Sequence, residues 1–190
     1  EKEKEYLATV SSEVKRLSRL VVSMLNLSKI ESGEVKIQPT KYNISSQILE
    51  TLISMEQRLN EKNISVEGLE EISEIKVLAD RDLVHQVIYN LLDNAVKFTN
   101  ENGTISVFAS EDKEKVSITL RNSGAGLAKE DISRIFERFY KVDRSRSFDV
   151  KGVGLGLYIV KTIINMHEGV IYADSKQGEY TQFTFTLPKG

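Results

Sequence analysis

The chain has 190 residues, including 26 Lys or Arg and 28 Asp or Glu, and a net charge of −2. Its hydrophobic content of 40% can supply a core, which excludes wholesale disorder at this low net charge. The absence of cysteine excludes disulfide scaffolds, cysteine-ligated zinc and thiol nucleophiles, and two histidines argue against a histidine-rich metal site. The charge argues against nucleic-acid binding, and neither a signal peptide nor a membrane-spanning apolar run of about 18 residues is visible.

Residues 1–32 contain neither Gly nor Pro and predict one helix about 48 Å long that stops near Gly33. Apolar residues recur in alternating steps of three and four: Leu7, Val10, Val14, Leu17, Val21 and Met24. This spacing is a heptad seam of the coiled-coil type. The helix could pack on its own domain or form half of a helical hairpin, and the narrow seam favours the hairpin.

Beyond Gly33 the pattern predicts an α+β domain with a mostly antiparallel sheet and three helices stacked on one face. Asn43 is expected to cap the first of these helices, and Asp80 or Asp82 the second. The expected helices cover 44–63, from Asp80 or Asp82 to Phe98, and 155–167. The expected strands cover 34–42, 64–69, 75–78, 104–110, 116–121, 169–173 and 181–187, the last four as two hairpins.

The second of these helices carries polar side chains that suit a metal and phosphate. Asn90 and Asn94 are one turn apart and share a face with Lys97. Amide oxygens are hard ligands of the kind that Mg²⁺ prefers, and a lysine one turn away suits phosphate. The alternative from this window alone is a polar helix face turned to water.

Five of the eleven glycines lie between residues 124 and 156. Gly124 and Gly126 follow a strand beside Asn122, where the backbone can approach a planar ligand. Gly152, Gly154 and Gly156 stand where a helix begins, and free amides at a helix start bind anions. The spacing fits neither a Walker loop nor a dinucleotide fingerprint.

Between the two glycine groups, residues 135–147 mix aromatic residues, which can anchor a loop, with cations available for phosphate. The cations are Arg138, Lys141, Arg144 and Arg146. A charged, solvated turn is the alternative for this window, but three aromatic residues inside one loop argue against it. Each of the windows is weak evidence by itself.

Taken together, the windows are specific. HQVIYNLLDNAVKFT, NSGAG, FERFY and GVGLGL resemble, in order and spacing, the N, G1, F and G2 boxes of the bacterial sensor histidine kinases. Their catalytic domain is similar to the ATPase domains of DNA gyrase, MutL and a heat-shock chaperone. The resemblance implies a Bergerat-type two-layer α/β sandwich of about five strands plus a small hairpin, with three helices on one face. It assigns 1–32 to the second helix of the dimerisation and phosphotransfer hairpin, 33–190 to the ATP-binding domain, and about 128–153 to an ATP lid.

The resemblance also implies roles for individual residues. Asn94 matches the main Mg²⁺ ligand and Asn90 a supporting ligand, while Lys97 and Lys141 match residues that reach the phosphates. Phe98 stands beside the adenine, Asn122 where most members read the adenine amine with Asp, and Thr181 where a hydroxyl supports that residue through water. The remaining nucleotide-binding positions line the base pocket or frame the phosphates: Gly124, Gly126, Gly152, Val153, Gly154, Leu155, Gly156 and Leu157.

Three departures from the family pattern stand out. The phosphoacceptor histidine motif is absent, and we expect His85 and His167 to be structural. The chain is therefore expected to begin after the first hairpin helix and not to phosphorylate itself. Asn122 keeps a hydrogen-bond acceptor without the charge of Asp, so ATP binding should survive. Glu168 replaces a common Gly and should perturb only a turn.

The resemblance implies binding of ATP and Mg²⁺, and partners in the form of the family's own hairpin histidine and a response regulator. It also implies a homodimer of which this chain is a cytoplasmic portion, anchored to the membrane elsewhere. We expect the lid to be mobile without nucleotide because its anchors are few. Two alternatives stay open: a non-catalytic dimerisation module with a degenerate pocket, and a clamp-type ATPase, which would want a glutamate where Asn90 stands.

Overall fold

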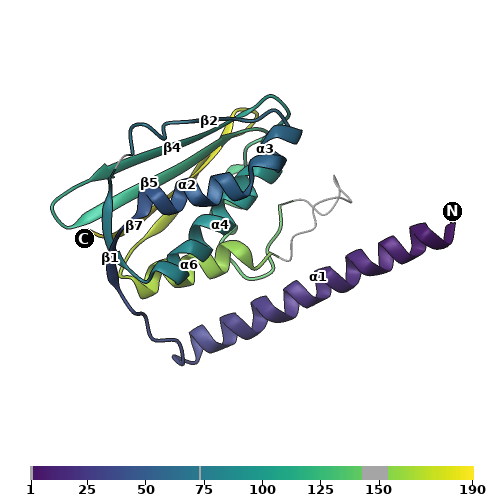
Figure 1. Ribbon diagram of the computed structural model, residues 1–190, viewed down its shortest axis with the longest axis horizontal. Coiled ribbons are helices and arrows are strands. Elements are labelled where there is room, and N and C mark those ends of the chain that lie inside the picture. Colours follow the sequence, from purple (N-terminus) through teal and green to yellow (C-terminus); the bar gives the residue numbers. More distant parts are fainter. Residues whose placement is uncertain (1, 73, 143–153) are drawn as a thin grey trace.

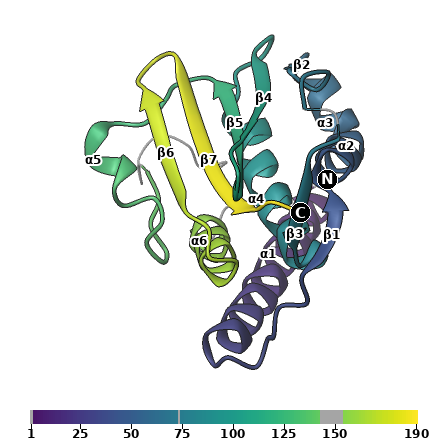
Figure 2. The same ribbon diagram turned by 90° about the vertical axis from the view of Figure 1, so that its left-hand side faces the viewer.

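The computed structural model describes residues 2–72, 74–142 and 154–190. A long helix, α1 (Lys2–Glu31), precedes a two-layer domain in which helices cover one face of a sheet (Figures 1 and 2). The other helices are α2 (Ile44–Ser54), α3 (Glu56–Glu61), α4 (Arg81–Phe98), α5 (Lys129–Ile132) and α6 (Gly156–Met166). The strands are β1 (Thr40–Asn43), β2 (Ser65–Glu67), β3 (Lys76–Ala79), β4 (Thr104–Glu111), β5 (Lys115–Ser123), β6 (Ile171–Lys176) and β7 (Tyr180–Pro188).

The main sheet has the strand order β2-β4-β5-β7-β6, in which only the β2–β4 pair is parallel. Strands β1 and β3 form a separate antiparallel pair. The resemblance implied a small hairpin beside the main sheet, without assigning its strands. The separate pair in the structure is joined through α2, α3 and β2, which lie between its strands in the sequence. The expected mostly antiparallel five-stranded sheet with three principal helices, α2, α4 and α6, on one face is confirmed.

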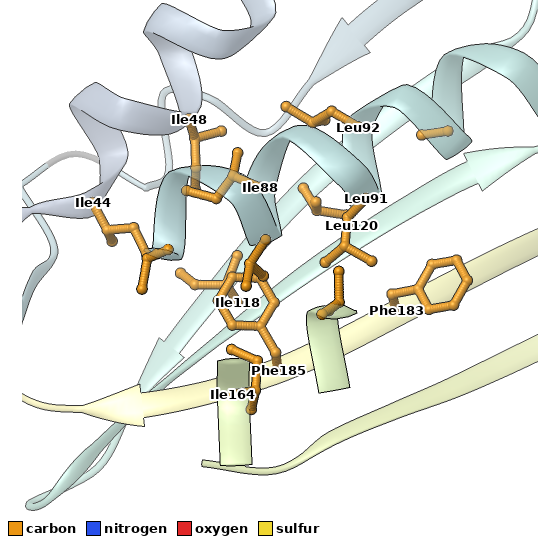
Figure 3. Close-up of a cluster of buried hydrophobic side chains, with 14 of the residues drawn as sticks. Ile44, Ile48, Ile88, Leu91, Leu92, Ile118, Leu120, Ile164, Phe183 and Phe185 are labelled. Carbon is orange, nitrogen blue, oxygen red and sulfur yellow. The ribbon is translucent and has the colours of Figure 1, made fainter. Parts of the chain in front are cut away.

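The core lies between the sheet and its helices (Figure 3). Alternate residues of β5 and β7 point inward, among them Ile118 and Phe185, because successive strand side chains face opposite sides of a sheet. From the helical layer, Ile44, Ile88 and Ile164 meet them, and all five of these side chains are fully buried. This packing fixes α4 and α6 side by side on the sheet.

Capping residues set where two of the helices begin. The Asn43 side chain accepts a hydrogen bond from the Ser45 amide at the start of α2, and Asp80 accepts from the amides of Asp82 and Leu83 at the start of α4. Both caps are as expected. The single helix expected over 44–63 is instead divided at Met55, whose backbone leaves helical geometry at φ −105° and ψ 4°. Met55 and Leu59 nevertheless enter the core, as the apolar spacing of one helix predicts.

The strand expected over 34–42 forms only from Thr40 onward. Upstream, the Gln38 amide donates to the Asp80 side chain at 2.9 Å and so is not available for hydrogen bonding to a neighbouring strand. Pro39 has no amide proton to contribute to a ladder either. The segment 34–39 is therefore an irregular connection between α1 and the domain.

Helix α1 meets the domain at its C-terminal end, where Leu27 and Ile30 are buried (Figure 1). The seam residues that precede them are 44–63% exposed: Leu7, Val10, Val14, Leu17, Val21 and Met24. Among the described residues, no helix combines the length and apolar character needed to cross a bilayer. The long helix is as predicted, and its apolar seam is exposed.

Candidate functional site

The carboxamides of α4 lie beside the start of α6. A Cβ atom added at Gly156 would lie 3.7 Å from the Asn90 side-chain oxygen, so this glycine leaves open space in front of that amide. Asn94 is one turn further along the same face, and both side chains are half-buried. Asn90, one of the two predicted hard-oxygen ligands, therefore lies next to the helix start at which the sequence predicts anion binding.

The first turn of α6 has no side-chain cap, a feature of helix starts that bind anions. Its N-cap, Leu155, has an apolar side chain that cannot accept hydrogen bonds from the amides of Gly156, Leu157 and Tyr158. Leu155 is itself buried, which fixes the start of the helix against the core. Amides without a side-chain cap and the helix dipole favour a negatively charged group at the start of a helix.

Asn122 and Thr181 form a second polar group at one end of the sheet. They are paired directly across β5 and β7, and both are buried, at 4% and 8% exposure. The Asn122 side-chain nitrogen donates to the Ser123 carbonyl at 3.1 Å, which leaves its oxygen as an acceptor. The Thr181 hydroxyl lies 3.4 Å from that of Ser175. A buried acceptor of this kind suits a base that carries an amine.

The glycine loop after β5 is held between α4 and the β6–β7 turn. A Cβ at Gly124 would lie 2.4 Å from the Phe98 carbonyl oxygen, and one at Gly126 would lie 2.4 Å from that of Lys176. The Gly124 amide donates to Glu179, and Gly178 donates to Ala125. A side chain at either position would therefore overlap the protein's own backbone, whether or not a ligand is bound. Phe98 is half-exposed beside this loop.

The segment before the second glycine group is tied to α6 and the sheet. The Phe139 amide donates to the Gly154 carbonyl at 2.9 Å, and the Phe136 ring packs edge-on against Phe183 with centroids 6.2 Å apart. Ile135 is buried. The other side chains of residues 128–142 are half-buried or exposed, so the anchors of this part of the lid are few, as expected. The rest of the expected lid, with Gly152, Val153, Arg144 and Arg146, lies outside the described residues.

Within the part of the chain that the structure describes, no group of three His, Asp or Glu residues could hold a metal ion. A metal bound here would have to rely on amide oxygens together with ligand oxygens. Mg²⁺ is commonly held in this way, through one or two protein groups plus substrate phosphates. Asn90 and Asn94, facing an anion-binding helix start, fit such a site.

The family described as histidine kinase-, DNA gyrase B-, and HSP90-like ATPase matches residues 79–190, which include α4, the glycine loop and α6. The chain belongs to this ATPase family. The curated relatives place it more narrowly. The sensor histidine kinase WalK of Bacillus subtilis is 33% identical over 186 residues, covering 96% of this chain and 30% of WalK. The sensor protein SrrB of Staphylococcus aureus is 32% identical over 98% of this chain and 32% of SrrB. The chain spans about a third of the length of these relatives.

Solved structures agree with this assignment. The catalytic domain of histidine kinase ThkA superposes with a TM-score of 0.68 at 29% identity, covering 80% of this chain and 96% of that domain. ThkA in complex with the response regulator protein TrrA matches with a TM-score of 0.76 at 27% identity, over 98% of this chain and 51% of that one. Full-length ShkA in complex with AMPPNP shares the fold, with a TM-score of 0.82 at 24% identity over 100% and 39%. The sequence-based assignment to the histidine kinase catalytic domains is confirmed.

The two predicted phosphate-binding lysines have different surroundings in this histidine kinase domain. Lys141 is exposed beside the F box, and the described residues offer it no ion pair. Lys97 instead pairs with Asp93 one turn earlier, with Nζ 2.5 Å from the carboxylate. Its ammonium must leave Asp93 to reach a phosphate.

Arg138 of the F box has a role that the sequence did not reveal. It was expected to be available for phosphate, but its guanidinium donates to the Glu31 carboxylate of α1 and, at 3.1 Å, to the Tyr158 hydroxyl of α6. The Tyr158 hydroxyl also donates to Glu31 at 2.9 Å. The three residues join the end of α1, the lid base and α6, a long-range arrangement that no local pattern encodes.

We expect Arg138→Ala to loosen the end of α1 from the domain while changing the stability of the domain little, since the pair is partly exposed. Hydrogen exchange measures this as faster exchange at residues 27–31. Arg134→Ala is the matched control, because Arg134 stacks on Tyr140 and pairs with Glu137, both within its own segment. Equal exchange at 27–31 in the two variants would contradict the role of Arg138.

Proposed function

We propose that this chain is the part of a sensor histidine kinase that binds Mg–ATP between α4 and α6 and presents its γ-phosphoryl group to a histidine. The observation that carries this proposal is the Asn90 carboxamide beside the glycine-fronted, anion-binding start of α6. Membership of the ATPase family and the similarity to ThkA support it.

In this proposal the adenine amine donates to the buried Asn122 oxygen, which Thr181 supports from the opposite strand. Phe98 and the loop of Gly124 and Gly126 border the base. The phosphates lie at the α6 start, near Gly154 to Leu157, with Lys97 and Lys141 offsetting their charge. Asn94 is the main Mg²⁺ ligand and Asn90 supports it. The metal ion, when bound, neutralises charge on the phosphate oxygens.

The transfer itself needs an imidazole from outside this chain. One of its nitrogens attacks the γ-phosphorus, the bond from that phosphorus to the β–γ bridging oxygen breaks, and ADP leaves with the bridging oxygen. His167 is committed elsewhere: the Asp80 amide donates to its Nε2 at 3.0 Å, Nδ1 lies 2.8 Å from the Ile163 carbonyl, and the ring is 3% exposed. His85 lies on α4, outside a dimerisation helix.

The exposed seam of α1 supports a wider proposal. We assign residues 1–32 to the second helix of a dimerisation hairpin whose first helix carries the acceptor histidine. An apolar stripe this narrow and this exposed fits pairing with another helix. The whole protein would then be a homodimer, with this cytoplasmic portion anchored to the membrane elsewhere. It would pass its phosphoryl group to an aspartate of a response regulator.

The test is transfer in trans. We expect the chain alone, incubated with Mg²⁺ and ATP labelled in the γ-phosphate, to acquire no stable label. Adding a separate hairpin that carries the acceptor histidine should give labelled phosphohistidine on that hairpin. The control is the same hairpin with its histidine replaced by alanine. Stable label on the chain without any hairpin, or none on the hairpin, would contradict the proposal.

A further inference from the structure

The Asp93 carboxylate on α4 is shared between two cations. Lys97 lies one turn later on the same helix, with Nζ 2.5 Å from Oδ2. Arg58 reaches across from α3, with Nη1 2.8 Å from Oδ1. The Asp93 side chain is 20% exposed, and those of Lys97 and Arg58 are 34% and 38% exposed. One carboxylate therefore holds the proposed phosphate-binding lysine and a second cation at the same time.

The backbone around Lys97 is fixed independently of this pair. The Lys62 ammonium, at the end of α3, donates to the carbonyls of Val96, Lys97 and Thr99, each at 2.9 Å. A cation at the C-terminal carbonyls of a helix stabilises that end. The last turn of α4 is thus held in place, so Lys97 can change partners by rotating its side chain alone.

We propose that Asp93 is a positioning residue that holds Lys97 away from the phosphate site until nucleotide binds, and that Arg58 then retains the carboxylate. This inference rests on the proposed function. Lys97 shares a helix face with Asn90 and Asn94, and the flexible stem of lysine lets its ammonium move from Asp93 toward that face. Arg58 remains paired throughout, so Asp93 is not left as an unpaired, partly buried charge when Lys97 departs.

The exchange sets the affinity for ATP through a competition. Binding must first break the Lys97–Asp93 pair, and a partly exposed pair of this kind opposes binding by a factor of about two to five. Asp93→Asn keeps an acceptor for Arg58 but no longer holds the ammonium, so ATP should bind more tightly by about that factor. Arg58→Ala leaves Lys97 as the only described cation on Asp93 and should weaken binding.

A double-mutant cycle separates this exchange from the general effect of removing a negative charge. Mg–ATP affinity is measured by calorimetry for the 190-residue chain, Asp93→Asn, Lys97→Ala and the double variant, with thermal unfolding as a check on folding. Removing a negative charge near the phosphates should favour ATP whether or not Lys97 is present. The release of Lys97 from Asp93 can contribute only when Lys97 is present. We expect the gain from Asp93→Asn to be about two- to five-fold larger when Lys97 is present.

Equal gains in both backgrounds, or a loss of affinity in Asp93→Asn, would overturn this inference alone. If Asp93→Asn fails to fold, Arg58→Ala replaces it in the double-mutant cycle with Lys97→Ala. We then expect a loss of Mg–ATP affinity that is larger when Lys97 is present. An equal loss with and without Lys97 would overturn the inference. A folded, unaltered chain that binds no Mg–ATP would overturn the proposed function as well. The affinity of the unaltered chain therefore distinguishes the two failures.

Discussion

Replacing Asn94 with Ala is expected to lower the affinity of the chain for Mg–ATP by about 10- to 100-fold, the usual effect of disturbing a metal site. The amide oxygen is the proposed metal ligand, and alanine offers no replacement. ATP titrated in the presence of EDTA should bind the variant and the unaltered chain nearly equally, because only the metal-dependent part is lost. Calorimetry under the two conditions measures both effects.

Asn165→Ala is the matched control for this experiment. Asn165 is an exposed asparagine on α6, near the end of the helix that lies away from the proposed site. Its replacement should leave both titrations unchanged. If Asn94→Ala binds Mg–ATP as tightly as the unaltered chain, the pocket does not use this residue. A degenerate pocket on an interaction module would then be the better interpretation.

Gly154→Ala should have the second large effect, on both stability and nucleotide binding. Gly154 has a φ of +78°, and an added Cβ would lie 2.8 Å from the Phe139 carbonyl carbon and from the Tyr140 carbonyl oxygen. The left-handed backbone costs alanine about 1–2 kcal/mol, and the overlap adds about 1–3 kcal/mol unless the F box moves away. Because the Phe139 amide donates to the Gly154 carbonyl, such movement would also displace Lys141 and weaken ATP binding.

Gly33→Ala separates the cost of the left-handed backbone from the cost of steric overlap. Gly33 has a similar φ of +73°, but a Cβ there would meet nothing within 4 Å. Urea unfolding should show a loss of only about 1–2 kcal/mol for this variant, with ATP affinity unchanged. If the two alanine variants lose the same stability and both keep normal ATP affinity, the contact between the F box and α6 has no part in nucleotide binding.

The sequence predicted those parts of the fold that local chemistry determines. The caps at Asn43 and Asp80, the Asn90 and Asn94 pair and the β4–β5 hairpin follow from helical or strand periodicity and turn residues, and all are found. The family boxes added the order of the elements. Glu168, where a glycine is common, has a φ of +56°, so the left-handed turn is kept despite the side chain.

The parts that sequence reasoning missed depend on contacts between distant segments. The pairing of β1 with β3 and the burial of Ile135 are set by tertiary packing. The Arg138 contact with Glu31 joins residues 107 positions apart. Gly124 was predicted from what a ligand needs, but the nearest obstacle to a side chain there is the Phe98 carbonyl. A sequence window can show that a glycine is required without showing which contact requires it.

The most direct test of the central claim is a crystal structure of this chain with Mg²⁺ and a non-hydrolysable ATP analogue. We expect the metal ion on the Asn94 side-chain oxygen, the phosphates at the start of α6, and the adenine amine against Asn122. Lys97 should have left Asp93 for a phosphate, with Arg58 still on the carboxylate. Nucleotide bound elsewhere on the domain, or an α4–α6 site filled by side chains in the presence of the analogue, would contradict the account.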